Sequence, residues 1–148
     1  MRFFISVIII LSGLVLFVLL DLNSIWLFLD LPSFILVGLF PFLFASTLIG
    51  FKKMKSAFSI LRNNKPEKGT LMQALYFFDM YGKVTWITGL VFLIIGVIGL
   101  LANLEDTAAL GANLALALIC PLYSGLINLV IVIPYKITIK RKVMEMEN

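Results

Sequence analysis

The chain alternates four long apolar runs with shorter polar connections. A helix needs about 20 mostly apolar residues to cross a bilayer, because it rises about 1.5 Å per residue through roughly 30 Å of hydrocarbon. Each run is long enough or nearly so, which predicts an all-α integral membrane protein with a single membrane domain over residues 1–148. The four predicted transmembrane helices are about 3–20, 33–50, 84–101 and 110–133.

The first apolar run could instead be a secretory signal peptide. It is longer than a typical signal core, however, and no small-x-small cleavage motif follows it. We therefore expect residues 3–20 to be retained as a transmembrane helix.

Charged residues divide cleanly between alternate connections. All 12 basic residues lie at Arg2, in the middle segment 51–83 or in the tail 135–148. The connections after the first and third spans contain no lysine or arginine. Because basic residues stay on the cytoplasmic side, this pattern predicts that both termini and segment 51–83 are cytoplasmic. The acidic residues of the two outer connections are Asp21, Asp30, Glu105 and Asp106.

The middle segment begins with an amphipathic pattern. Its apolar residues recur at helical spacing between lysines, so we expect the second span to continue inward as an amphipathic helix. That apolar face could pack on neighbouring helices or lie along lipid headgroups, and the sequence leaves both open. The apolar positions are Phe51, Met54, Phe58 and Leu61.

A second helix is predicted to lead into the third span. The cluster of Asn, Lys, Pro and Gly at 63–69 breaks the first helix. Thr70 and Gln73 have the spacing of a capping box, which predicts a new helix start there. Asp79 and Lys83, four residues apart with the acid first, would support this helix.

Composition excludes several classes of function. The chain is 61% hydrophobic and 14% charged, with a mean hydropathy of +1.09, so the bilayer is its solvent. The net charge of +4 sits in loops and tails, where it indicates orientation rather than a nucleic-acid partner. With no histidine and the single cysteine Cys120, we expect no disulfide within the chain, no metal site, no cofactor and no catalytic residues of an enzyme.

The third and fourth spans each carry a distinct stripe. Gly89, Gly96 and Gly99 share one face of the third span, where small residues let helix backbones approach closely. A weakly polar stripe runs along the fourth span and either packs helices together or lines a pore shared between subunits. Its residues are Asn113, Ala117, Cys120, Ser124 and Asn128.

The last three spans contain no Asp, Glu, Lys or Arg. A proton relay needs a titratable group near the middle of the membrane. If protons cross at this protein, a partner must therefore supply the acid.

The residues from Gly89 to Pro134 resemble the MotA/TolQ/ExbB proton-channel family, and most closely its four-helix MotA branch. They read GLVFLIIGVIGLLANLEDTAALGANLALALICPLYSGLINLVIVIP. The likeness lies in a glycine-rich third span, a short acidic turn and a fourth span that ends in proline. The start of the second span is also similar to the family, at Asp30, Pro32, Ser33, Val37 and Gly38.

This resemblance implies a homopentameric ring in a bacterial inner membrane. Five A-type subunits would surround the helices of a B-type partner, a single-span membrane protein whose membrane aspartate carries the ion. The third and fourth A-type helices would line the pore. The proton-motive force would drive the complex. The pore-lining candidates are Thr88, Leu93, Asn113, Ala117, Cys120, Pro121, Ser124 and Asn128.

The chain also departs from the family. Phe92 and Leu93 stand where the family often has a small or hydroxyl residue, and Cys120-Pro121 stands where it has a Thr-Thr pair. The missing oxygens argue against sodium, and Pro121 is expected to bend the fourth helix. Only about thirty residues separate spans two and three, so the rotor-engaging insertion of flagellar members is absent.

Two functions follow from these observations. The first is a short A-type subunit of a proton-driven motor, as the resemblance implies. The second is a non-conducting membrane scaffold, whose ring holds a partner helix or a lipid and moves no ions; Leu93 and the missing acid favour it.

Overall fold

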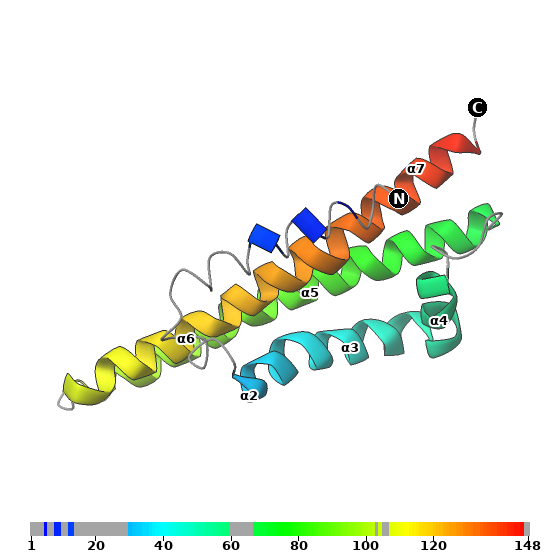
Figure 1. The fold of residues 1–148 in the computed structure, drawn as a ribbon. Helices are drawn as coiled ribbons and strands as arrows, with labels where there is room; N and C mark the ends of the chain where they lie inside the picture. Colours follow the sequence, from blue (N-terminus) through cyan, green and yellow to red (C-terminus); the bar gives the residue numbers. More distant parts are fainter. Residues whose placement is uncertain are drawn as a thin grey trace.

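The fold is a bundle of helices, seen in a computed structural model of the chain (Figure 1). The structure describes residues 5, 8, 9, 12, 13, 30–59, 67–102, 104 and 107–146, and these include no strand. Three of the helices are long and apolar enough to cross a membrane: Leu31–Ile49, Lys68–Leu101 and Asn113–Glu145. They correspond to the second, third and fourth predicted spans, whereas most of the first, at 3–20, lies outside the described residues.

The second span consists of α2 (Leu31–Phe34), the π-helical segment η2 (Ile35–Leu39) and α3 (Phe40–Ile49) in direct succession. It begins two residues before the predicted start, because Asp30 caps it. The Asp30 carboxylate accepts hydrogen bonds from the backbone N–H of Ser33, at 3.2 Å, and from its hydroxyl. Pro32 lies in the first turn, where a missing N–H costs nothing.

The predicted amphipathic helix forms as α4 (Phe51–Ser59), but it does not continue the line of α3. Gly50 separates the two helices with φ +92°, a conformation that favours glycine, and α4 turns towards α5 (Figure 1). Ala57 is 1% exposed, and the ring of Phe58 lies 5.8 Å from Phe77 and 5.3 Å from Phe78. Neighbouring helices therefore cover Met54 and Phe58 on the apolar face of α4, whereas Phe51 is 55% exposed and Leu61 lies outside the described residues.

The third span is part of one 34-residue helix, α5 (Lys68–Leu101), about 51 Å long at 1.5 Å per residue. The prediction that the helix of the middle segment runs straight into the third span is confirmed. The predicted capping box is wrong, because the helix starts at Lys68 with Glu67 at the cap position, and Thr70 and Gln73 lie inside it. Residues 67–69 are exposed, so water can satisfy the free N–H groups without a side-chain cap.

The fourth span runs antiparallel to α5 and forms a long hairpin with it (Figure 1). It consists of α6 (Thr107–Ile127), the π-helical segment η3 (Asn128–Val132) and α7 (Ile133–Glu145). The predicted span 110–133 is thus the middle of a longer helix, and most of the predicted tail 135–148 is helical.

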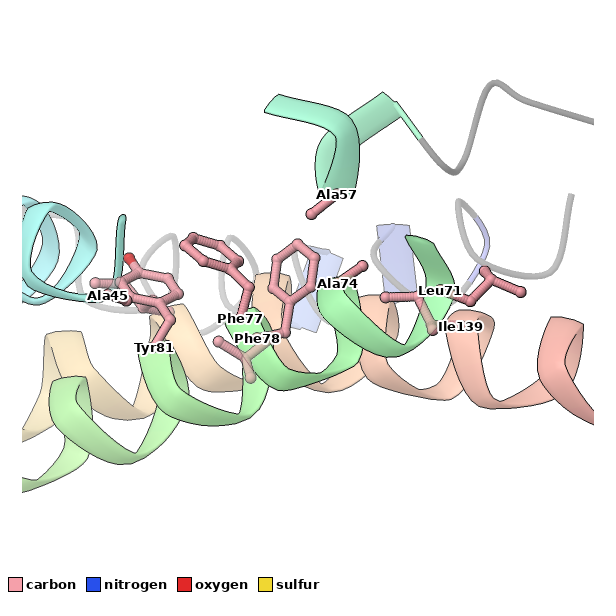
Figure 2. Close-up of a cluster of buried hydrophobic side chains, with 10 residues drawn as sticks. Ala45, Ala57, Leu71, Ala74, Phe77, Phe78, Tyr81 and Ile139 are labelled. Atoms are coloured by element: carbon pink, nitrogen blue, oxygen red, sulfur yellow. The ribbon is translucent and has the colours of Figure 1, made fainter. Parts of the chain in front are cut away.

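The buried core lies at one end of this hairpin, where α3, α4 and α7 meet α5. Figure 2 shows Phe77 and Phe78 of α5 projecting towards α4, with Tyr81 beside Ala45 of α3 and Ile139 of α7 near Leu71. Phe78 also stacks on Tyr135 of α7, with ring centroids 4.5 Å apart. The other end of the hairpin has little cover, since Ile94, Ile98 and Leu118 are each more than half exposed. Such apolar surfaces need lipid or other protein around them.

Candidate functional site

The interface between α5 and the fourth span is built on three glycines spaced seven residues apart: Gly82, Gly89 and Gly96. A Cβ atom on Gly96 would lie 2.6 Å from the Cβ of Ala117, and one on Gly82 would lie 2.7 Å from Oδ1 of Asn128. A Cβ on Gly89 would clash with the hydroxyl of Ser124. No side chain fits at these positions, so glycine sets the distance between the two helices.

The sequence pattern found two of these glycines but not the third. Gly82 was missed because it lies among polar residues, outside the apolar run of the third span. The repeat of seven residues from Gly82 through Gly89 to Gly96 is the signal that could have found it. Gly99, grouped with them on sequence alone, has nothing within 4 Å of its Cβ position and lies outside the interface.

The middle of the polar stripe faces α5 within the same chain. Ala117 and Cys120 are each 6% exposed, and Ser124 is fully buried. The Ser124 hydroxyl donates a hydrogen bond to the carbonyl of Pro121, at 2.9 Å. Nδ2 of Asn128 donates to the carbonyl oxygens of Ser124, at 2.9 Å, and Gly82, at 3.3 Å. These contacts support the packing interpretation of the stripe.

One flank of the hairpin carries a groove bounded by the start of the second span. Asn113 and Cys120 lie on its wall, together with Phe92 and Ser33. Asn113 is exposed, whereas Thr88 is half-buried and stands one helical turn from Phe92, on the same flank. This groove therefore gathers Asn113, Ala117 and Cys120, the candidates nearest the turn between α5 and α6.

The remaining candidates lie towards the opposite flank. Leu93 is half-buried and lies seven residues after Trp86, so both share one face of α5. Pro121 lies one turn before Gly125, whose Cβ position is 3.6 Å from the Trp86 ring. A single chain thus does not bring the eight pore-lining candidates onto one surface. The helix α6 continues on both sides of Pro121.

A charged cluster joins α5 to α7 on the same flank as Trp86. The Asp79 carboxylate pairs with Lys83 of its own helix, at 2.7 Å, as its spacing predicted, and with Lys136 of α7, at 2.6 Å. The second pair was missed because the two residues are 57 positions apart in sequence. The cluster lines a groove that also includes Asn128 and Lys140.

The start of the second span is fixed to the middle of the fourth. The backbone N–H of Asp30 donates to the hydroxyl of Tyr123, at 2.9 Å, and Phe34 meets the Tyr123 ring edge-on, with centroids 5.9 Å apart. Tyr123 lies 16 residues beyond Thr107, the first residue of α6, or about 24 Å along the helix. The second span therefore begins well inside the length of the hairpin rather than at the turn between α5 and α6.

No family model, curated protein or solved structure matches this chain. The resemblance to the MotA/TolQ/ExbB family thus depends on the residues from Gly89 to Pro134 and at the start of the second span. Among the residues that the structure describes, no group of three or more His, Cys, Asp and Glu could hold a metal ion. The features available for function are the tight hairpin, its exposed apolar flanks and the charged groove.

Proposed function

We propose that this chain is a short MotA-like A-type subunit of a proton-driven motor in a bacterial inner membrane. It has four transmembrane helices with both ends in the cytoplasm, and five copies form a ring around the helices of a B-type partner. The observation that carries the proposal is a hairpin of two long helices, closed by its own glycine interface and apolar on both flanks. Such a unit can be repeated side by side without rebuilding its core.

The exposed flanks support assembly with other helices. The second span leaves many apolar side chains of the hairpin exposed. The space at the Cβ position of Gly99 also allows a further helix to approach. On α5 these residues include Ile87, Leu90, Val91, Ile94, Ile98 and Leu101, and on α6 they include Leu114, Leu116, Leu118 and Leu122.

In this proposal the chain supplies the wall of the pathway and the partner supplies the titrating group. Neither 84–101 nor 110–133 contains an Asp, Glu, Lys, Arg or His. The aspartate of the B-type helix takes up and releases the proton as it passes an apolar wall that includes Leu93. The rigid hairpin then transmits movement of the ring to its cytoplasmic end.

Native mass spectrometry of the complex extracted in mild detergent tests this proposal. We expect five copies of this chain with two copies of a single-span protein that has an aspartate in its membrane helix. A monomer, or a ring with no second protein when the neighbouring genes are co-expressed, would contradict it.

A non-conducting scaffold is the second candidate. It is favoured by the burial of Ser124 and by the two hydrogen bonds that the Asn128 side chain donates within the hairpin, which leave few polar groups for a water-filled path. Proton uptake by vesicles containing the complex distinguishes the two functions. The motor predicts a flux that is lost when the partner aspartate is changed to asparagine, whereas the scaffold predicts no flux in either case.

A further inference from the structure

The groove between α5 and α7 is basic. It has a volume of about 380 Å³, and its charged residues are Lys83, Lys136, Lys140 and Asp79. Three ammonium groups and one carboxylate give these residues a formal charge of +2. The chain therefore presents an anion-attracting pocket that neither the hairpin interface nor the proposed ring requires.

The contacts inside the groove hold two of the lysines in place. The Asp79 carboxylate binds Lys83 with one oxygen and Lys136 with the other, so both ammonium groups sit side by side at its edge. Lys140 lies one helical turn beyond Lys136, is exposed and forms no ion pair with any described residue. No described residue therefore competes with an incoming anion for its ammonium group.

The groove also lies where the chain changes from polar to apolar. Lys83 is the last charged residue before the uncharged stretch 84–101, and Lys136 is the first after the uncharged stretch 110–133. Trp86, 47% exposed, lines the groove at this boundary, and tryptophan is enriched at the level of lipid headgroups.

An apolar strip continues from the groove along the hairpin. Leu90 is one turn beyond Trp86 on α5, and Leu129 is one turn before Ile133 on the antiparallel helix. Leu90, Leu129 and Ile133 are all 40% exposed or more. A ligand with an anionic head and an apolar chain would match both parts of this surface, whereas free phosphate would match only the first.

We propose that this groove binds the headgroup of an anionic phospholipid. The lipid phosphate lies among the ammonium groups of Lys83, Lys136 and Lys140, where charge-assisted hydrogen bonds form. Its glycerol region lies beside Trp86, and one acyl chain follows the strip past Leu90. Basic pockets between transmembrane helices on the cytoplasmic side are suited to such headgroups. The inference does not depend on the proposed motor function.

Quenching of tryptophan by brominated lipid tests the site directly. The chain has two tryptophans, so a Trp26→Phe background leaves Trp86 as the only reporter. The full-length protein is reconstituted in phosphatidylcholine vesicles containing a small fraction of brominated phosphatidylglycerol, or the same fraction of brominated phosphatidylcholine. We expect about 25-fold preference for the anionic lipid, about fivefold for each of the two net positive charges, and a loss of about fivefold for each lysine replaced.

Lys140→Gln is the first variant, because this lysine makes no ion pair that holds the described helices together. Lys140→Gln with Lys83→Gln should abolish the preference. The matched control is Lys52→Gln with Lys55→Gln, which removes the same charge from exposed positions on α4. Equal quenching by the two brominated lipids, or an equal loss in the control, would overturn the proposal. Complete displacement by millimolar inorganic phosphate would overturn the lipid as the ligand.

Discussion

Gly89 leaves no room for a side chain between α5 and the fourth span. A Cβ atom there would clash with the Ser124 hydroxyl and lie 3.1 Å from the carbonyl oxygen of Cys120. Ser124 is fully buried, so it cannot move away easily. We predict that Gly89→Ala lowers the free energy of unfolding by about 1–3 kcal/mol, the usual cost of overpacking. Unfolding by SDS, followed by circular dichroism, measures the change.

Gly99→Ala is the matched control for this prediction. The Cβ position of Gly99 is open, and alanine is the better helix former by about 1 kcal/mol, so stability should stay the same or rise. Equal destabilisation by the two substitutions would show that the glycines act through helix flexibility rather than through close packing.

Asp79 holds two lysines and so affects both stability and the charge of the groove. Asp79→Asn removes two partly exposed ion pairs, and we expect a loss of about 1 kcal/mol in the free energy of unfolding. The same change raises the formal charge of the groove residues from +2 to +3, so the preference for anionic lipid should increase. Unfolding in SDS and the quenching of Trp86 measure the two effects on the same protein.

The two effects of Asp79→Asn have opposite signs, which makes this prediction specific. Its control is Glu145→Gln, which breaks the exposed pair with Arg141 at the end of α7 and should change neither quantity by much. The loss of stability should shrink as salt is added, because exposed charges are screened. A fall in lipid preference would contradict the assignment of the groove as an anion site.

At the scale of elements, both π-helical segments precede a proline. η2 ends two residues before Pro41, and η3 ends two residues before Pro134. A proline ring clashes with the carbonyl four residues earlier, which here belongs to Val37 and Val130, inside the two segments. The wider turn of a π-helix relieves this clash and lets the helix continue.

This arrangement predicts that Pro134 sets the rotation of α7. Pro134→Ala allows η3 to return to α-helical bonding, which would turn α7 by about one residue, or 100°. Lys136 would then move away from Asp79. In a chain carrying Cys120→Ser, Asp79→Cys and Lys136→Cys, a short bismaleimide should join the two thiols, and Pro134→Ala should reduce the yield severalfold.

Pro121→Ala serves as the comparison for this experiment. Pro121 lies inside α6 with no π-helical segment beside it, so its removal should straighten the fourth helix without rotating α7. If the two substitutions reduced the cross-link equally, a general distortion of the helix would explain the result better than a change of register.

The apolar pattern alone predicted where the second, third and fourth spans lie, because about 20 uncharged residues admit few other structures. It did not predict the turn at Gly50 or the direction of α4, which depend on a single backbone conformation and on contacts with Phe77 and Phe78. The helix start at Lys68 was missed because exposed N–H groups need no special residue.

Within the candidate site, local features were predictable and distant ones were not. The glycine stripe with Gly89 and the polar stripe with Ser124 could each be seen from helical spacing, but the fact that the two stripes face each other could not. The pairing of Asp79 with Lys136 joins residues 57 positions apart, and no periodicity reports such a contact. The hydrogen bond between Asp30 and Tyr123 likewise joins residues that are far apart in sequence, 93 positions in this case.

At the scale of the whole molecule, the second span and the hairpin are offset. The second span starts beside Tyr123, so the part of the hairpin near the turn between α5 and α6 extends beyond it (Figure 1). Apolar residues are exposed on several sides of this part, among them Ile95 at 55% and Leu118 at 51%. A second chain placed beside the first would cover these surfaces and make the two flanks of neighbouring hairpins meet.

The register of the hairpin allows this contact to be tested. Gly96 faces Ala117, so their neighbours Ile95 and Leu118 lie at nearly the same height on the antiparallel helices. Ile95 lines the groove beside the second span, whereas Leu118 shares the helix face of Gly125 on the opposite flank. Rotation about the membrane normal preserves height, so a ring would bring Ile95 of one chain close to Leu118 of the next.

A chain with Cys120→Ser, Ile95→Cys and Leu118→Cys should therefore form a ladder of cross-linked species with a bismaleimide in membranes, and the largest should contain five chains. Each single-cysteine variant can give dimers at most, because one thiol cannot join two neighbours. Thr85→Cys in place of Ile95→Cys should prevent the ladder, since Thr85 is fully buried. If both introduced thiols react with a monofunctional maleimide but no species larger than the monomer forms, the flanks face lipid and the ring is refuted.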